Sequence, residues 1–307
     1  MIGITGAFDW PAALDFLARR AIHGVECVSG TTYQRTIRLG RSSGILSIAY
    51  RAHDNALEIA VAPRVGPIDE VHMRVRRMFD VDADLASINA HLSKDPFLSP
   101  LVSARGAIRV AGGWDPFEVA IRTVIGQQVS VARARQLNGV LVARCGARLP
   151  EGRLRPNPAG DRLRHAFPTP AEILGADLSS LGMPGARVET LRSVATAATE
   201  DPALFARGAS LDETIARLRS IRGIGDWTAH YIAMRACRER DAFPASDVGL
   251  LRGAEDPMGR RPTPAALLER AEAWRPWRAY AAHHLWAADS TARGGVRHEV
   301  VSATLHS

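Results

Sequence analysis

The sequence predicts an α+β protein in which a small domain with an antiparallel sheet precedes a larger helical core. Two observations lead to this fold class. The first 80 of the 307 residues contain short apolar and β-branched runs separated by turn residues. After Phe79, apolar residues recur only with the period of a helix, and no convincing strand remains. We therefore expect an N-terminal α+β domain over residues 1–80 and a helical core over residues 81–290.

The N-terminal domain is expected to hold a short strand, a helix, a three-stranded antiparallel meander and a second helix. The turn sequences GRSSG and HDNA separate the strands of the meander. Helical periodicity then returns in VGPIDEVHMRVRRMF. In chain order, the expected elements are strand 2–5, helix 11–22, strands 33–39, 45–50 and 57–61, and helix 65–79.

The rest of the chain is expected to be a series of helices. Residues 146–165, rich in Gly, Pro and Arg, form a loop between two helical groups. Residues 291–307 show no periodicity, so we expect a mobile tail there. The expected helices are 84–92, 116–127, 131–144, 170–174, 186–198, 211–218, 227–237, 248–253, 264–272 and 276–288.

The charge of the chain favours a polyanionic partner. It has 39 basic and 32 acidic residues, a net charge of +7 and a pI of about 10.1. Only Lys94 is a lysine, and every other basic residue is an arginine, whose planar fork of donors suits phosphate. Codon usage in a GC-rich genome explains the same excess. In either case, chemistry that needs a nucleophilic lysine has one candidate.

Composition also argues against several classes of protein. No run of 18 apolar residues is present, so no membrane span is expected. The N-terminus lacks the features of a signal peptide, which favours a cytoplasmic location. Cys27, Cys145 and Cys237 form no CxxC pair and cannot supply a four-thiolate metal site. His283 and His284 have no Cys or acidic cluster nearby, so a metal role is not expected for them either.

The segment 221–247, IRGIGDWTAHYIAMRACRERDAFPASD, carries the clearest functional signal. Two glycines permit a tight turn, and a helix begins directly after it. The first amides of that helix have no partner within it and favour an anion. Gly223, Gly225 and Thr228 are thus candidates to hold a DNA phosphate through their backbone. The carbonyl groups of Arg219, Ile221 and Ile224 are candidates to bind a monovalent cation.

Asp247 follows the second glycine by 22 residues and begins another helix. A carboxylate there could stabilise positive charge on a deoxyribose and orient or deprotonate a water molecule. It could equally be an N-cap, which is a common role for aspartate at a helix start. The residues alone leave both roles open.

These segments resemble the helix–hairpin–helix motif and the following aspartate of the base-excision DNA glycosylases, and most of all the 3-methyladenine DNA glycosylase II family. The likeness covers residues 5–290 and includes the FDWPAALDFLARRA opening, DPFEVAIRTVIGQQVSVARARQL, LGMPGARVETLRSVA and WRPWRAYAAHHLW. It implies two helical subdomains, with a hairpin at about 211–237, an active-site cleft between them and Asp247 as the catalytic carboxylate.

The resemblance also implies a pocket for an extruded base. It places Phe16, Trp227, Tyr231 and Trp286 around the base, with Gln127 beside them. Electron-rich rings attract a cationic, alkylated base, which is already a good leaving group. Each aromatic residue could instead belong to the core, and core packing suits Trp227 and Tyr231 nearly as well because they lie one helical turn apart.

Gln128 occupies the position of the side chain that fills the hole left by the base. The best-known members of the family carry an aliphatic wedge there. An amide can fill space and form a hydrogen bond with the orphaned partner base, but it stacks less well. Gln127 and Gln128 could alternatively form a polar loop tip.

Trp227 stands where the related bifunctional glycosylases carry a Schiff-base lysine, and Lys94 is distant in sequence. We therefore expect a monofunctional DNA glycosylase that removes 3-methyladenine and 7-methylguanine, without β-lyase activity and without a cofactor. Its partner would be double-stranded DNA containing alkylated bases, and it would act as a monomer. A glycosylase for hypoxanthine and an inactive damage-sensing DNA-binding protein are the alternatives.

Overall fold

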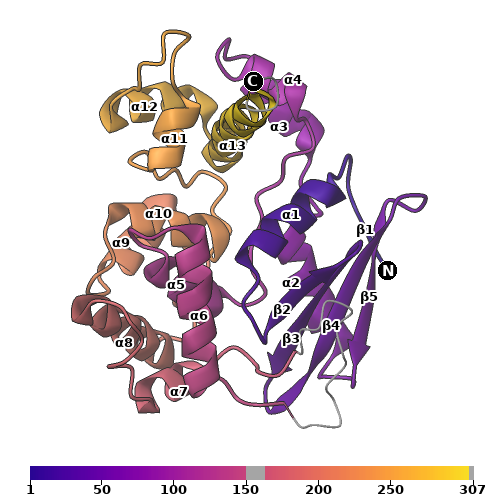
Figure 1. Ribbon diagram of the computed structural model, residues 1–307, viewed down its shortest axis with the longest axis vertical. Coiled ribbons are helices and arrows are strands. Elements are labelled where there is room, and N and C mark those ends of the chain that lie inside the picture. The colour runs from indigo at the N-terminus through magenta and orange to yellow at the C-terminus, as the bar shows by residue number, and fades with distance from the viewer. Residues whose placement is uncertain (150–162, 304–307) are drawn as a thin grey trace.

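The computed structural model describes residues 1–149 and 163–303, with side-chain surroundings as far as residue 291. It confirms the α+β class: a five-stranded sheet with two helices stands beside a helical body, as Figure 1 shows. Among the described residues, no helix is long and apolar enough to cross a membrane.

The sheet is antiparallel throughout, with the strand order β1-β5-β4-β3-β2. Four of its strands are those expected. The strand formed by ECVS was not expected, because four residues with two polar side chains give too little alternation to identify. The strands are β1 (Ile2–Gly3), β2 (Glu26–Ser29), β3 (Thr32–Leu39), β4 (Ser42–Arg51) and β5 (Ala56–Ala62).

Two helices cover one face of this sheet. The first is α1 (Trp10–Arg20), which begins with a side-chain cap from Asp9 and a proline in its first turn. The second is α2 (Ile68–Phe79). Trp10, Tyr33 and Leu57 are among the buried residues that join the helices to the sheet in one hydrophobic cluster.

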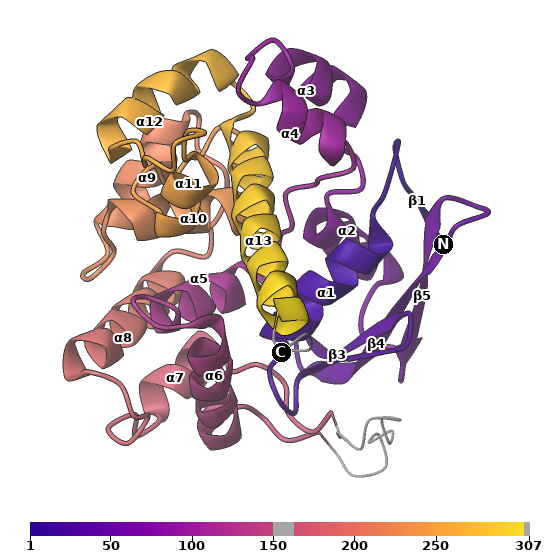
Figure 2. The same ribbon diagram turned by 45° about the horizontal axis from the view of Figure 1, so that its top comes forward.

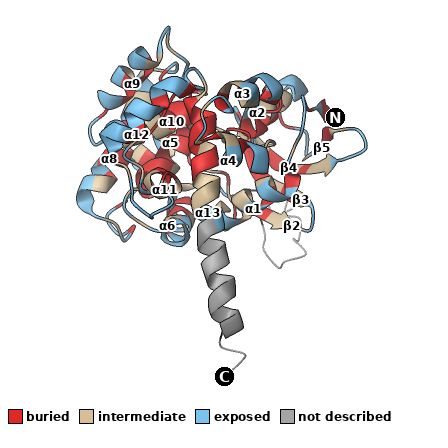
Figure 3. Ribbon diagram, turned by 90° about the horizontal axis from the view of Figure 1, so that it is seen from above, coloured by how far each residue is buried: buried red, intermediate tan, exposed pale blue. Residues whose placement is uncertain are grey.

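The helical body has its own, larger hydrophobic cluster, which begins at Ala83. Figure 3 shows buried residues concentrated near α5, α10 and the first part of α13. Most of its helices are those expected, and α4 is an addition. They are α3 (Leu85–Leu92), α4 (Ser99–Ala104), α5 (Pro116–Ile125), α6 (Val131–Cys145), α7 (Pro170–Gly175), α8 (Gly185–Glu200), α9 (Leu211–Arg219), α10 (Asp226–Arg235), α11 (Val248–Gly253), α12 (Pro264–Ala271), the 3₁₀ turn η2 (Glu272–Trp274) and α13 (Arg278–Ala303).

The last helix is longer than expected. We expected a helix over 276–288 and a mobile tail after it, whereas α13 continues to Ala303, as Figure 2 shows; the mobility of this segment stays a prediction. This segment shows no periodicity of its own. Once a helix has formed, however, each further residue adds a hydrogen bond, so a packed first half can extend it. Residues 304–307 of the expected tail lie outside the described residues.

The loop expected between the two helical groups returns to the sheet domain. The backbone N–H of Arg164 donates to the carbonyl of Gly24 at 2.7 Å, and Leu149 and Leu163 are buried with Ile45. Residues 150–162 of this loop lie outside the described residues. The loop therefore fastens the helical body to one edge of the sheet domain.

Candidate active site

Asp247 stands at the start of α11 and caps it. Its Oδ1 accepts the backbone N–H of Leu250 at 3.0 Å. The N-cap role is thus real, and it fixes the carboxylate at a defined position. Gly249 leaves the necessary space, because a Cβ there would lie 3.0 Å from both Asp247 Oδ1 and Trp286 Cδ1.

Two tryptophans complete the environment of this carboxylate. Trp227 Nε1–H donates to Asp247 Oδ2, and Trp286 Nε1–H donates to Oδ1, both at 2.8 Å. No arginine or lysine forms an ion pair with Asp247 among the described residues, and Arg252 of the same helix is bonded to Asp289 instead. Neutral N–H donors therefore hold the carboxylate without cancelling its charge.

The aromatic side chains gather around the same point. The rings of Trp227 and Tyr231 are stacked, with centroids 5.2 Å apart and planes at 19°. The Tyr231 ring packs edge-on against the Trp286 ring, with centroids 6.0 Å apart. The His283 ring also packs edge-on against Trp286, with centroids 5.1 Å apart. The structure thus brings together Asp247 and three of the four aromatic residues predicted for the pocket. Their contact with a base stays a prediction.

Phe16 reaches this group from the sheet domain through two arginines that sequence analysis missed. The guanidinium of Arg235 lies 4.7 Å from the Phe16 ring centroid and 5.5 Å from that of Tyr231. The Arg20 guanidinium lies 4.0 Å from the Phe16 centroid. Each arginine follows a predicted pocket aromatic by four residues on the same helix. Arg20 therefore shares a face of α1 with Phe16, and Arg235 shares a face of α10 with Tyr231. That spacing is the signal that could have identified them.

The two cations change the acidity of their neighbours. Burial lowers the pKa of Arg20 to about 10, and the nearby Arg235 adds to this effect. Burial would raise the pKa of the Tyr231 phenol, but Arg235 and Arg20 together lower it below its ordinary value. Arg235 Nη1 also donates to Tyr231 Oη at 2.8 Å. One end of the pocket is therefore positively charged, opposite in sign to Asp247.

The hairpin between α9 and α10 has the geometry that its glycines suggested. Gly223 has φ +87°, and a Cβ there would lie 1.9 Å from Thr190 Oγ1, so only glycine fits. Gly225 is the N-cap of α10 and offers no side chain to its first amides. These amides are free of a side-chain cap, as an anion site requires. Phosphate binding by this turn stays a prediction.

Thr228 and Gln127 bind each other. Gln127 Nε2 donates to Thr228 Oγ1 at 2.9 Å, and Thr228 is buried. Because the side chain is buried, the backbone amide is the group of Thr228 that stays a candidate to bind a phosphate. The Gln127 amide joins the loop after α5 to the hairpin helix, so its nitrogen is already occupied within the protein.

Gln128 lies exposed at the tip of the loop between α5 and α6. Its φ of +56° is unusual for a residue other than glycine. A side chain held outward on a strained backbone suits insertion into DNA, although the wedge role itself stays a prediction.

The predicted cation and metal positions are less informative. In the hairpin, the carbonyl of Ile221 accepts the N–H of Ile224 at 3.1 Å, and nothing tests a cation at the three predicted carbonyls. Burial lowers the pKa of His283 to about 3 and that of His284 to about 4, so both rings are neutral. No group of three His, Cys, Asp or Glu side chains suited to a metal occurs among the described residues.

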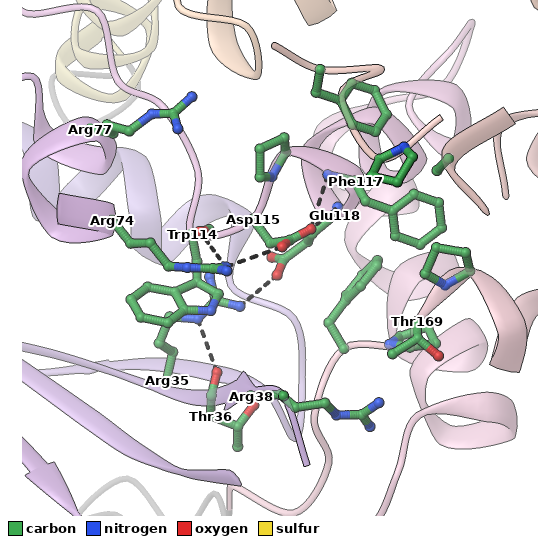
Figure 4. Close-up of a pocket in the computed structure, with 18 of the residues that line it drawn as sticks. Arg35, Thr36, Arg38, Arg74, Arg77, Trp114, Asp115, Phe117, Glu118 and Thr169 are labelled. Carbon is green, nitrogen blue, oxygen red and sulfur yellow. Dashed lines mark hydrogen bonds and ion pairs between the residues drawn. The ribbon is translucent and has the colours of Figure 1, made fainter. Parts of the chain in front are cut away.

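A second cavity, shown in Figure 4, lies at the other end of α5. It has a volume of about 560 Å³, and Asp247 and the pocket aromatics do not line it. Its arginines are largely paired: Arg35 with Glu118 at 2.6 Å, and Arg74 with Asp115 at 3.2 Å. This cavity is thus separate from Asp247.

The fold is that of the helix–hairpin–helix DNA glycosylases. The 3-methyladenine DNA glycosylase of Archaeoglobus fulgidus superimposes with a TM-score of 0.80 over 94% of this chain and 98% of that chain, at 20% identity. Residues 3–115 match the AlkA N-terminal domain family. DNA-3-methyladenine glycosylase 2 of Escherichia coli K12 is 32% identical over 91% of this chain and 93% of its own length. The chain belongs to the AlkA, or DNA-3-methyladenine glycosylase 2, family.

Some relatives are longer than this chain. The probable bifunctional transcriptional activator/DNA repair enzyme AlkA of Mycobacterium tuberculosis is 33% identical over 92% of this chain. The chain spans 55% of the length of that relative.

Proposed function

We propose that the protein is a monofunctional DNA glycosylase that hydrolyses the N-glycosidic bond of alkylated purines, with 3-methyladenine and 7-methylguanine as substrates. The observation that carries this proposal is the Asp247 carboxylate, held by two indole N–H groups and, among the described residues, paired with no cation. Relatives named as DNA-3-methyladenine glycosylases support the same substrate class.

The carboxylate would act on the sugar. When the bond from C1′ to the base breaks, both bonding electrons leave with the base and the deoxyribose gains oxocarbenium character. The charge of Asp247 stabilises that cation, and a free carboxylate lone pair can take a proton from the attacking water. The water oxygen then bonds to C1′. The products are the free base and an abasic site.

An alkylated purine suits this site because it is already a good leaving group. A base methylated at N3 or N7 is cationic in the nucleoside and leaves as a neutral molecule, so no general acid is needed. The electron-rich faces of Trp227 and Trp286 attract such a base. The same two side chains would therefore bind the base and orient the carboxylate.

Extrusion of the base from the duplex would use the hairpin turn and the loop between α5 and α6. The amides after Gly223 and Gly225 would hold a phosphate, which gives affinity without sequence preference. Gln128 would fill the space left by the extruded base. The Gln127–Thr228 hydrogen bond joins the loop that carries Gln128 to the hairpin helix. It would therefore fix the position of the wedge relative to the phosphate-binding amides. The partner is double-stranded DNA, and we propose that a cytoplasmic monomer acts on it.

Cleavage of the DNA strand is not expected. Trp227, whose nitrogen bonds Asp247, takes the position of a Schiff-base lysine in bifunctional enzymes. Lys94 lies exposed near the end of α3. An enzyme without a lysine at the sugar leaves the phosphodiester backbone intact.

Two measurements test this proposal. Mass spectrometry of bases released from methylated duplex DNA should show 3-methyladenine and 7-methylguanine, and the strand should be cut only after alkali treatment. Borohydride should trap no covalent enzyme–DNA adduct, with Lys94→Arg as a control. Release of neither base would refute the glycosylase, whereas an adduct that survives in Lys94→Arg would refute only its monofunctional character.

A further inference from the structure

Beside the proposed base pocket lies a cation, Arg20, most of whose hydrogen-bond donors have no partner among the described residues. Arg20 lies in the last turn of α1, against Phe16. Building on the proposed function, we propose that Arg20 is a specificity-determining residue that donates hydrogen bonds to the carbonyl oxygen at C6 of an extruded purine. It would favour guanine-type and hypoxanthine-type bases over adenine-type bases.

The first argument is position. Phe16 lies against both arginines, at 4.0 Å from Arg20 and 4.7 Å from Arg235. Arg235 in turn is bonded to Tyr231, whose ring stacks on Trp227. Arg20 therefore stands at one wall of the aromatic group that ends at Asp247.

The second argument is the use of donors. Arg235 has committed all three of its nitrogens: Nη1 to Tyr231, Nε to the carbonyl of Ala111 at 3.0 Å and Nη2 to that of Gly112 at 3.4 Å. Arg20 forms one long bond, from Nη1 to the Phe16 carbonyl at 3.4 Å. No acidic side chain pairs with Arg20 among the described residues. A guanidinium has five N–H donors, so Arg20 keeps most of its donors for a ligand.

The third argument is charge. Arg20 is largely surrounded by protein, and Arg235 and Arg122 lie close enough to disfavour its positive charge. Tyr231 is one neighbour that favours it. A ligand atom with lone pairs would relieve this imbalance, whereas an amino group would worsen it. The site is thus suited to an oxygen acceptor.

Purines differ in the group they carry at C6, so hydrogen bonds from Arg20 would select between them. Guanine and hypoxanthine present oxygen at C6 beside N7, and arginine binds such an edge with two parallel hydrogen bonds. Adenine presents an amino donor at C6, which opposes the N–H groups of the guanidinium. A contact of this kind discriminates between bases by about tenfold or more.

The test compares 3-methylguanine with 3-methyladenine, which share the site of methylation and both occur in methylated DNA. Single-turnover release of the two bases is measured by mass spectrometry for the wild type and for Arg20→Gln. We expect the ratio of the 3-methylguanine rate to the 3-methyladenine rate to fall at least about tenfold in Arg20→Gln. Arg20→Lys, which keeps charge but loses the planar fork, should give an intermediate ratio.

Arg19→Gln is the matched control, because the neighbouring arginine is exposed and pairs with Asp15. It should leave the ratio as in the wild type. Equal losses of both bases in Arg20→Gln, or an unchanged ratio, would overturn the specificity role while leaving the glycosylase proposal standing. Release of neither base by the wild type would refute the proposed function, and this inference with it.

Discussion

Asp247 and Glu118 are both carboxylates held by several donors, but their partners differ in charge. Glu118, on α5, receives Arg35 Nη2 at 2.6 Å and Arg122 Nη1 at 2.9 Å. Asp247 receives two indole N–H groups and one backbone N–H. The first carboxylate is neutralised where it stands. The second is equally well oriented, yet its charge remains available to a cation that forms during a reaction.

The arginine-paired carboxylates form a structural network. Glu26, on β2, also receives Arg122 and accepts from Tyr33 Oη at 2.7 Å. Burial raises the pKa of Glu26, but Arg122 and Arg35 outweigh this and lower it. This network connects the sheet to α5, where two hydrophobic clusters meet. Removing a partner there leaves a buried charge unpaired, so the network serves stability, whereas we propose that the Asp247 site serves chemistry.

The largest effect is expected from Asp247→Asn. Loss of the negative charge should lower single-turnover base release about a thousandfold. Asparagine is as good an N-cap as aspartate, although one indole N–H loses its acceptor, so the free energy of unfolding should change by less than about 2 kcal/mol. Base release from methylated DNA and urea unfolding measure the two quantities. A variant as active as the wild type would show that Asp247 is only an N-cap.

The same chemical change at Glu118 should have the opposite outcome. Glu118→Gln leaves Arg35 buried without a full counter-charge and should lower the free energy of unfolding by about 3 kcal/mol. Base release per folded molecule should stay within about threefold of the wild type. Urea unfolding and active-site titration separate these effects. If the activity falls as far as in Asp247→Asn, the distinction between the two carboxylates is wrong.

Mild acid should lower the free energy of unfolding through two histidines of α13, His283 and His284. The folded-state pKa values of His283 and His284, about 3 and about 4, lie below the ordinary value of 6.5. The unfolded chain therefore takes up protons first, and stability present above pH 6.5 is lost as the pH falls toward 4. At pH 5 each residue should cost about 2 kcal/mol. The lowered pKa of Glu26 leaves its ion pairs intact over this range.

Urea unfolding at pH 7.5 and pH 5 measures this loss. His284→Asn should lose about 2 kcal/mol less than the wild type between the two pH values. His53→Gln, which replaces a fully exposed side chain, is the control and should behave as the wild type. An equal loss in His284→Asn and the wild type would place the acid sensitivity elsewhere.

The smallest effect is expected from Trp227→Phe. The ring is kept for stacking, but Asp247 loses one N–H donor, which should lower base release about tenfold. Trp277→Phe is the control, because that indole packs against Tyr280 and forms none of the hydrogen bonds to Asp247 among the described residues. The measurement is the single-turnover rate of base release by each variant from the same methylated DNA. Equal rates would mean that the Trp227 N–H does not help orient Asp247.

Local sequence patterns predicted most of the fold. Alternation located three strands of the meander, and helical periodicity located most helices, because both patterns come from burial of one face. The strand β2 was missed because four residues are too short to show a period, and α4 was missed because, unlike α7 and α11, it has no capping side chain at its start. The extension of α13 was missed because it continues a packed helix rather than a pattern of its own.

Local sequence patterns predicted less of the candidate active site than of the fold. Trp227 and Trp286 lie 20 and 39 residues from Asp247, so only the family resemblance, not periodicity, suggested that they meet. Arg20 and Arg235 carried a helical spacing, but an arginine one turn from an aromatic residue is usually a solvated charge. The Arg35–Glu118 pair spans 83 residues, and nothing local to either residue indicates it.

The pocket wall formed by Phe16 and Arg20 comes from α1, whereas the carboxylate comes from α11. Arg122 of α5 holds the wall in place through a hydrogen bond from its Nη2 to the Arg20 carbonyl at 2.8 Å. The wall lies within the part of the chain that matches the AlkA N-terminal domain, and the carboxylate lies outside it. If Arg20 and Asp247 act as we propose, selectivity and bond cleavage can diversify separately in descendants of this gene, because substitutions along α1 would alter which lesion is accepted while the proposed hydrolytic centre is inherited unchanged.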